Sequence, residues 1–123
     1  MPHATDQHIT FQVYDATGQA QHVLLSVDER TAHGTLSISP IPGGASQSRE
    51  LAALQKSHDG TILKCKVGIA TVTFTIDATP SPPTLALVAR ALFPLLETTY
   101  TLSREDQQRL VAWSAALRLD VMA

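Results

Sequence analysis

Apolar and polar residues alternate along the first part of the chain. In "HITFQVYD" every second residue from Ile9 to Val13 is apolar, and in "HVLLSVD" the same holds from Val23 to Val27. Strict alternation is typical of a β-strand with one buried face. A third alternating stretch, "GTLSIS" at 34–39, follows a short polar loop. We therefore expect three consecutive strands in the first third of the chain.

The stretch "DATGQ" between the first two strands predicts a hairpin loop. Asp15 favours turns, and Gly18 suits a left-handed position in a bulged loop. If Asp15 pairs with Gln19, Phe11 lies opposite Val23. We expect this register because it keeps the apolar residues of both strands on one face.

Two leucines three residues apart predict a short helix in "SRELAALQKS", residues 48–57. Leu51 and Leu54 would share one side of that helix. Asp59 and Gly60 would end it and turn the chain.

The stretch "TILKCKVGIATVTFTID" changes phase near Gly68, because apolar residues alternate on both sides of this glycine but with opposite parity. A hairpin that turns at 68–71 would pair Cys65 with Phe74, apolar against apolar. One long bulged strand would also absorb the phase change. We prefer the hairpin.

A buried helix is predicted in the next stretch, where Leu85 to Leu96 is apolar nearly all round. Ser81 is a candidate N-cap, with Pro82 at the first helical position. Pro94 would end or kink this helix.

A last, amphipathic helix is predicted after Ser103, a good N-cap followed by acidic residues in the first turn. Leu110, Trp113 and Leu117 form an apolar stripe at helical spacing. Such a stripe packs on the fold or forms an interface with a partner, where tryptophan is a frequent anchor. Both interpretations stay open.

Taken in order, these elements predict an α+β fold in a single domain over residues 1–123. Its antiparallel sheet has about five strands in the order βββ-α-ββ-αα, with the helices packed on one face. A chain of this length buries a core without a disulfide or metal.

Charge and composition limit the kinds of partner expected for this chain. The net charge is −2 and no basic run occurs, which argues against nucleic-acid binding. The longest apolar stretch, "LALVARALFPLL", contains an arginine and is too short to span a membrane. The start of the chain lacks the pattern of a signal peptide, so we expect a cytoplasmic protein. Only 16% of residues are charged, which indicates a surface that a partner protein covers in part.

The single cysteine, Cys65, stands between Lys64 and Lys66. Neighbours in a strand point to opposite faces, so both lysines point away from the thiol. A thiol in apolar surroundings is inert, and we expect Cys65 to be a core residue. The sequence contains no glycine-rich phosphate loop, nucleophile elbow, H-E-x-x-H or Cys-x-x-Cys, so no cofactor is expected.

The polar face of the sheet is the candidate ligand-binding surface, because a face of this composition suits an anionic or polar ligand. The alternative is an ordinary solvent-exposed sheet face that binds no ligand. His8 and His22 with Asp28 are spaced too loosely to hold a metal ion. The candidate ligand-binding residues are His8, Tyr14, His22, Lys64 and Lys66.

These observations favour a non-catalytic protein-interaction or assembly module of a small soluble, bacterial protein. Its partner would be another protein or a second copy, as in a homodimer. Two alternatives stay open. One is a small-ligand-binding domain with the ligand between sheet and helices. The other is a hydrolase or isomerase that uses His8, His22 and Tyr14.

Overall fold

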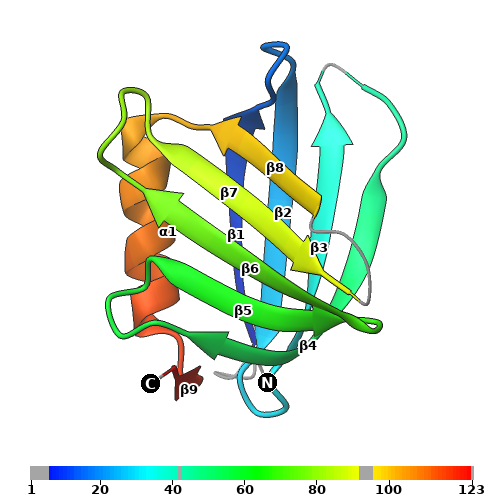
Figure 1. Cartoon of the computed structure of the whole chain (residues 1–123), viewed down its shortest axis with the longest axis vertical. Coiled ribbons are helices and arrows are strands. Elements are labelled where there is room, and N and C mark those ends of the chain that lie inside the picture. Colours follow the sequence, from blue (N-terminus) through cyan, green and yellow to red (C-terminus); the bar gives the residue numbers. More distant parts are fainter. Residues whose placement is uncertain (1–5, 42, 92–95, 123) are drawn as a thin grey trace.

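Eight antiparallel strands follow one another along the chain and close into a barrel, with one helix after them (Figure 1). The computed structural model describes residues 6–41, 43–91 and 96–122. Each barrel strand pairs with its neighbours in sequence, and the last returns to the first. The predicted α+β fold, with helices on one face of a sheet, is therefore wrong: the chain is mainly β.

The first three strands confirm the predicted pattern. The backbone N–H of Asp15 donates to the carbonyl of Gln19 at 3.0 Å, and Gly18 has a φ of +85°. Phe11 lies opposite Val23, as the phase of the two strands requires. These strands are β1 (Asp6–Tyr14), β2 (Ala20–Asp28) and β3 (His33–Pro40).

The fourth strand, β4 (Gln47–Lys56), occupies the segment predicted as a helix at 48–57, so that prediction is wrong. Ala53 has a φ of +52°, and the pairing with the next strand shifts by one residue at this point. This β-bulge adds one residue to the strand. Leu51 and Leu54 are therefore both buried in the barrel although they are three residues apart.

The hairpin predicted around Gly68 is confirmed, with a shorter turn than expected. Gly68 and Ile69 alone connect the two strands, and the φ of +59° at Gly68 suits a two-residue turn with glycine first. Cys65 consequently lies opposite Val72 and not Phe74, a shift that leaves its side chain on the predicted face. The strands are β5 (Ile62–Val67) and β6 (Ala70–Asp77).

The second predicted helix is also wrong, because its sequence forms strands. Leu85 and Leu87 lie in the apolar lining of the barrel, whereas Ala86 and Val88 are half-buried on the other face. A strand with apolar residues on both faces cannot be told from a buried helix by periodicity. The strands are β7 (Thr84–Arg90) and β8 (Leu96–Thr101).

The residues predicted to begin and end that helix do not do so, because the segment is not helical. Ser81 and Pro82 lie in the connection between β6 and β7. Pro94 lies outside the described residues.

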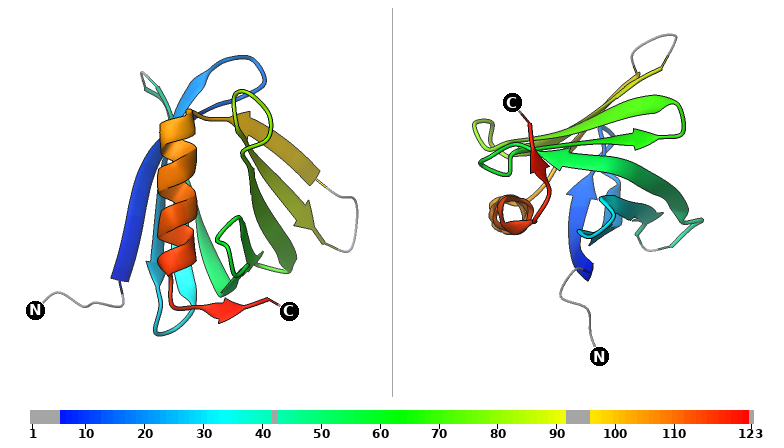
Figure 2. Two further views of the ribbon diagram at one scale, coloured as in Figure 1. Left: turned by 90° about the vertical axis from the view of Figure 1, so that its left-hand side faces the viewer. Right: turned by 90° about the horizontal axis from the view of Figure 1, so that it is seen from below.

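The last helix is confirmed as α1 (Arg104–Ala116), and Ser103 is its N-cap. The Ser103 side chain accepts a hydrogen bond from the backbone N–H of Asp106 at 3.1 Å. A two-residue strand, β9 (Asp120–Val121), follows and pairs in parallel with β4. Among the described residues, no helix has the length and apolar character needed to cross a membrane. Figure 2 shows α1 lying lengthwise along the side of the barrel, between the β1–β3 layer and the β5–β8 layer.

The barrel closes through a narrow contact. β8 pairs with β7 along its whole length, but it meets β1 at a single residue pair, Tyr14 with Thr101. The rest of β1 therefore has no strand on that side within the described residues. Backbone groups left unpaired away from water are costly, so the β1 edge requires another partner.

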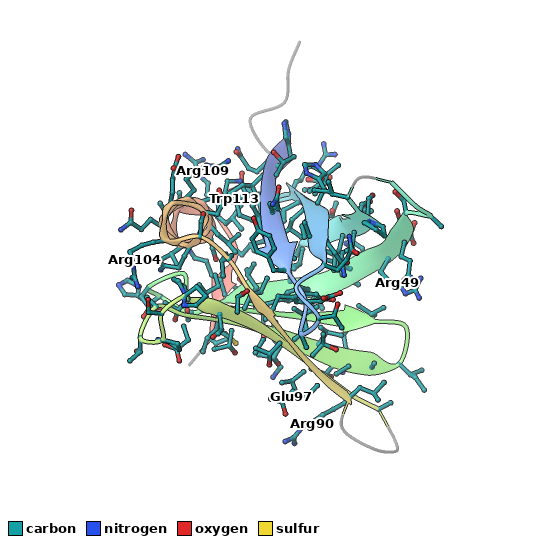
Figure 3. All side chains as sticks on the ribbon, turned by 90° about the horizontal axis from the view of Figure 1, so that it is seen from above. Arg49, Arg90, Glu97, Arg104, Arg109 and Trp113 are labelled. Carbon is teal, nitrogen blue, oxygen red and sulfur yellow. The ribbon has the colours of Figure 1, made fainter. Side chains whose placement is uncertain are left out.

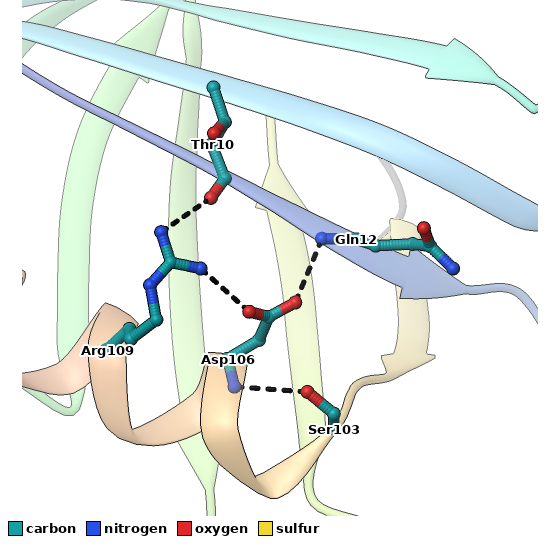
Figure 4. Close-up of polar contacts among 5 residues, drawn as sticks. All are labelled: Thr10, Gln12, Ser103, Asp106 and Arg109. Atoms are coloured by element: carbon teal, nitrogen blue, oxygen red, sulfur yellow. Dashed lines mark hydrogen bonds and ion pairs between the residues drawn. The ribbon is translucent and has the colours of Figure 1, made fainter.

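Two side chains of α1 provide that partner (Figure 4). The backbone N–H of Gln12 donates to Oδ2 of Asp106 at 3.2 Å, and Arg109 donates to the carbonyl of Thr10 at 3.1 Å. Asp106 and Arg109 also pair with each other at 2.7 Å. The helix thus offers β1 an acceptor and a donor in the positions where a neighbouring strand would offer them.

The C-terminal end of α1 is held by a buried lysine. Lys56 of β4 is only 6% exposed, and its Nζ donates to the carbonyls of Ser114 and Ala115. A cation is favourable here because the helix dipole is negative at this end. Gly60, in the β4–β5 turn, lets the helix come close. A Cβ on Gly60 would lie 2.6 Å from the carbonyl oxygen of Val111, and its φ of +80° also favours glycine.

Asp106→Ala tests the contact between α1 and β1. The substitution leaves the Gln12 N–H without its acceptor and Arg109 without its carboxylate, so we expect a loss of ~1–3 kcal/mol in the free energy of unfolding. Glu105→Ala is the matched control, because it removes an exposed carboxylate from the same turn and should change stability by less than about 0.5 kcal/mol. Urea unfolding measures both, and equal losses would show that the contact contributes nothing.

Cys65 should react slowly with thiol reagents in the native protein. It is 1% exposed, and burial raises the pKa of its thiol to about 11, which leaves little thiolate near neutral pH. Labelling in urea is the reference, and an equal rate in the native state would contradict this. Because the folded pKa lies above the unfolded value of 9.0, the contribution of the thiol to stability is complete below pH 9 and lost as the pH rises toward 11.

Candidate functional site

The five residues predicted to bind a ligand lie on two separate parts of the barrel. His8, Tyr14 and His22 belong to β1 and β2, and both histidines have the cross-strand positions expected from the hairpin. Lys64 and Lys66 belong to β5, in the other layer (Figure 1). Closure of the strands into a barrel therefore separates the two groups, and they do not converge on one ligand.

The polar contacts of these residues are local. The Tyr14 hydroxyl accepts a hydrogen bond from Gln12 at 2.6 Å, and Lys66 donates to the Thr71 hydroxyl at 2.9 Å. Within residues 6–41, 43–91 and 96–122, no hydrogen bond joins His8, His22 and Tyr14 to one another. The same residues contain no group of three His, Cys, Asp or Glu side chains that could hold a metal ion.

His8 lines a shallow depression of about 480 Å³ across β1 to β4. Cross-strand pairing sets His8, Ser26, Thr35 and Glu50 in one lateral row, one residue on each strand. Three strand spacings separate the two ends of this row by roughly 14 Å. His8 and Glu50 are therefore too far apart to exchange a proton.

The apolar stripe of α1 packs against the barrel of its own chain. Leu110 and Leu117 are 2% and 4% exposed and belong to the core. Trp113 is partly buried, and its Nε1 is enclosed without a hydrogen-bond partner among the described residues. Figure 3 places Trp113 on the side of the helix that faces β1. Of the three predicted interface residues, Leu110 and Leu117 are buried and Trp113 is partly exposed.

The barrel interior is filled by side chains. The void at its centre measures about 20 Å³ and is lined by apolar residues together with the Tyr100 ring. A space of this size holds about one water molecule, and an apolar lining offers that water no partners. Leu110 of α1 reaches into the same region. Around this void, strand and helix side chains fill the space where one alternative places a ligand.

The outer edge of β8 carries backbone groups that no strand of the described residues pairs with. Leu102 donates from its backbone N–H to the carbonyl of Pro83 at 3.1 Å, on the β7 side. Hydrogen-bonding direction alternates along an antiparallel strand, so the backbone of Tyr100 also faces β7. The N–H and C=O groups of Glu97 and Thr99 face the opposite way. No strand of the described chain lies along that side of them.

Apolar side chains are exposed beside this edge. Leu96 is 68% exposed, and Leu87 and Tyr100 are only partly buried, as is Ile38 of β3 in the other layer. The barrel is thus well packed beside α1 and less covered beside β8. Burial raises the pKa of Tyr100, and the nearby charge of Asp15 raises it further, so the phenol stays neutral at physiological pH.

Few charges protect the β8 edge. Glu97 is the one charged residue in the strand "LETTYT". Figure 3 shows Glu97 beside Arg90, both on the side of the β7–β8 ribbon that points away from the barrel. Figure 1 shows β8 as the outermost strand of the front layer.

The sequence interpretation missed this edge because it assigned Leu96 to a helix. The signal that could have found β8 is its composition. Three threonines and a tyrosine in six residues are typical of a strand, and Leu96 and Tyr100 share one parity. Sequence alone still could not show that only one side of the strand is paired, since that depends on the position of β1.

Comparison of the chain with protein-family models, curated proteins and solved structures finds no match. The chemistry of the site therefore follows from its geometry. Among the described residues, the β8 edge combines backbone donors and acceptors that no strand pairs with and exposed apolar side chains, which is the chemistry of a template for an added strand.

Proposed function

We propose that the chain is a non-catalytic protein-interaction module that binds an extended segment of a protein along the free edge of β8. One observation carries the proposal: over Leu96–Tyr100, β8 is hydrogen-bonded to β7 on one side, and on the other side no strand of the described residues pairs with it. An exposed row of backbone N–H and C=O groups is a template for an added strand.

Within the described residues, two other strand edges carry groups that oppose pairing with a further strand. α1 covers the edge of β1 through Asp106 and Arg109. The N-terminal half of β4 extends beyond its pairing with β5, but it carries the opposite charges of Arg49 and Glu50. Charged residues on an edge oppose pairing with another chain. Glu97 is the one charged residue of β8. Of these three edges, β8 is therefore the least protected against pairing with another chain.

The chemistry of the partner follows from the two faces of β8. A strand added along this edge alternates its side chains between the inner and outer face. Side chains on the inner face would contact Leu96 and Tyr100 at the weakly covered end of the barrel. Side chains on the outer face would lie beside Glu97. The edge therefore suits a segment with apolar residues at every second position.

The two alternatives have less support. A ligand within the barrel would have to displace core side chains, because the void is about 20 Å³. An acid–base enzyme needs two groups within hydrogen-bond reach. In the described part of the chain, His8, His22 and Tyr14 form no such pair.

Thr99→Pro tests strand addition directly. The N–H of Thr99 points to the free edge, so proline removes a donor for the partner and breaks no hydrogen bond to β7. Peptides selected by display against the native protein should carry alternating apolar residues and should lose at least about tenfold in affinity on Thr99→Pro, or ~1.4 kcal/mol.

Thr99→Val is the matched control, because it removes the same hydroxyl but keeps the N–H, and it should retain binding. Hydrogen exchange should show the amides of Glu97 and Thr99 protected in the peptide complex. Peptides that bind Thr99→Pro as well as the native protein, or that protect another strand, would contradict the proposal.

A further inference from the structure

We propose that the segment bound by β8 is β8 of a second copy, paired antiparallel about a two-fold axis at Thr98. This inference rests on the proposed function, since it uses the same free edge. It names the partner and fixes the register of the contact.

The hydrogen-bonding direction of β8 limits the registers that a symmetric pair can adopt. Only the backbone groups of Glu97 and Thr99 face the free edge between Leu96 and Tyr100. In an antiparallel pair, residues that face the partner strand must lie opposite residues that also face it. The two-fold axis must therefore pass through position 97, 98 or 99.

Two of the three registers are unfavourable. An axis at Glu97 places this carboxylate directly opposite its copy, and like charges opposite each other are destabilising. An axis at Thr99 requires Glu97 to pair with Thr101 of the second copy, but Thr101 is already paired with Tyr14. An axis at Thr98 avoids both conflicts.

The register centred on Thr98 uses every free group. Glu97 lies opposite Thr99 of the second copy, and Thr99 opposite its Glu97. Each pair exchanges both backbone hydrogen bonds, as hydrogen-bonded antiparallel pairs do. Thr98 meets Thr98 of the second copy at the centre, with its own N–H still directed to β7.

The side chains in this register are also complementary. On the inner face, Leu96 lies opposite Tyr100 of the second copy, so the 68% exposed leucine gains an aromatic neighbour. On the outer face, Glu97 lies opposite a threonine, with no second carboxylate across from it. Aromatic and aliphatic pairs across strands stabilise a sheet. The edge is thus complementary to itself in hydrogen bonding and apolar contact, and no two carboxylates lie directly opposite each other.

The pairing joins the β7–β8 layers of two barrels into one continuous sheet. The contact involves one short strand per copy, and interfaces below about 1,200 Å² are commonly weak and transient. The association should therefore depend on protein concentration.

Cysteine substitution reports both the pairing and its register. At the centre of a two-fold antiparallel pair, two residues that are not hydrogen-bonded to each other have Cα atoms about 4.5 Å apart, within the range of a disulfide. Thr98→Cys should form a covalent dimer in oxidised glutathione, with twice the 13.2 kDa mass of one chain. Glu97→Cys and Thr99→Cys should stay monomeric on the same gel, because each faces a different residue. The native protein is the control, since Cys65 is buried.

Light scattering on the unmodified protein should show a mass that rises with concentration, and Thr99→Pro should abolish the rise. The inference is overturned if the native protein stays monomeric at every concentration or if Thr99→Pro still dimerises. It is also overturned if Glu97→Cys or Thr99→Cys cross-links in preference to Thr98→Cys.

If the native protein is monomeric but peptide binding still depends on the Thr99 N–H, the second copy is excluded and the proposed function stands. If both fail, the β8 edge is not a binding site.

Discussion

The contact between α1 and the edge of β1 is the interaction on which the closed barrel depends. β1 and β8 share one residue pair, so their own hydrogen bonds do not close the gap between the two layers. Asp106 and Arg109 accept from and donate to the β1 backbone where a strand would otherwise pair. The helix can make this contact because Lys56 holds its other end from inside the barrel. A buried cation of this kind is stable only with such partners.

The same offset between β1 and β8 explains why the barrel has a covered side and an open one. Strands in a barrel are staggered, and here the stagger leaves the two end strands overlapping only at Tyr14 and Thr101. Each of these strands consequently keeps an unpaired edge. The edge of β1 is covered by α1, and the edge of β8 is uncovered among the described residues. The candidate binding site is therefore a consequence of how the barrel closes.

Neither the packed interior nor the outer polar residues, whose hydrogen bonds are local, form a converging ligand site in the described part of the chain. The apolar void of about 20 Å³ is too small for an organic ligand, and His8 and Glu50 lie too far apart to act on the same proton. Backbone hydrogen-bonding groups need no particular side chain, so a strand edge binds a partner without any recognisable sequence motif.

The sequence by itself determined the features that depend on local period and local chemistry. The register of β1 and β2 followed from alternation and from Asp15 and Gly18, the start of α1 followed from Ser103, and the burial of Cys65 followed from strand parity. The tertiary structure alone decided the rest. A bulge at Ala53 gave Leu51 and Leu54 the spacing of a helix face, and the two-sided burial of β7 gave it the composition of a buried helix. Those residues are strands because neighbouring strands pair with them, and their free and covered edges depend on contacts between residues far apart in the chain, which no local pattern records.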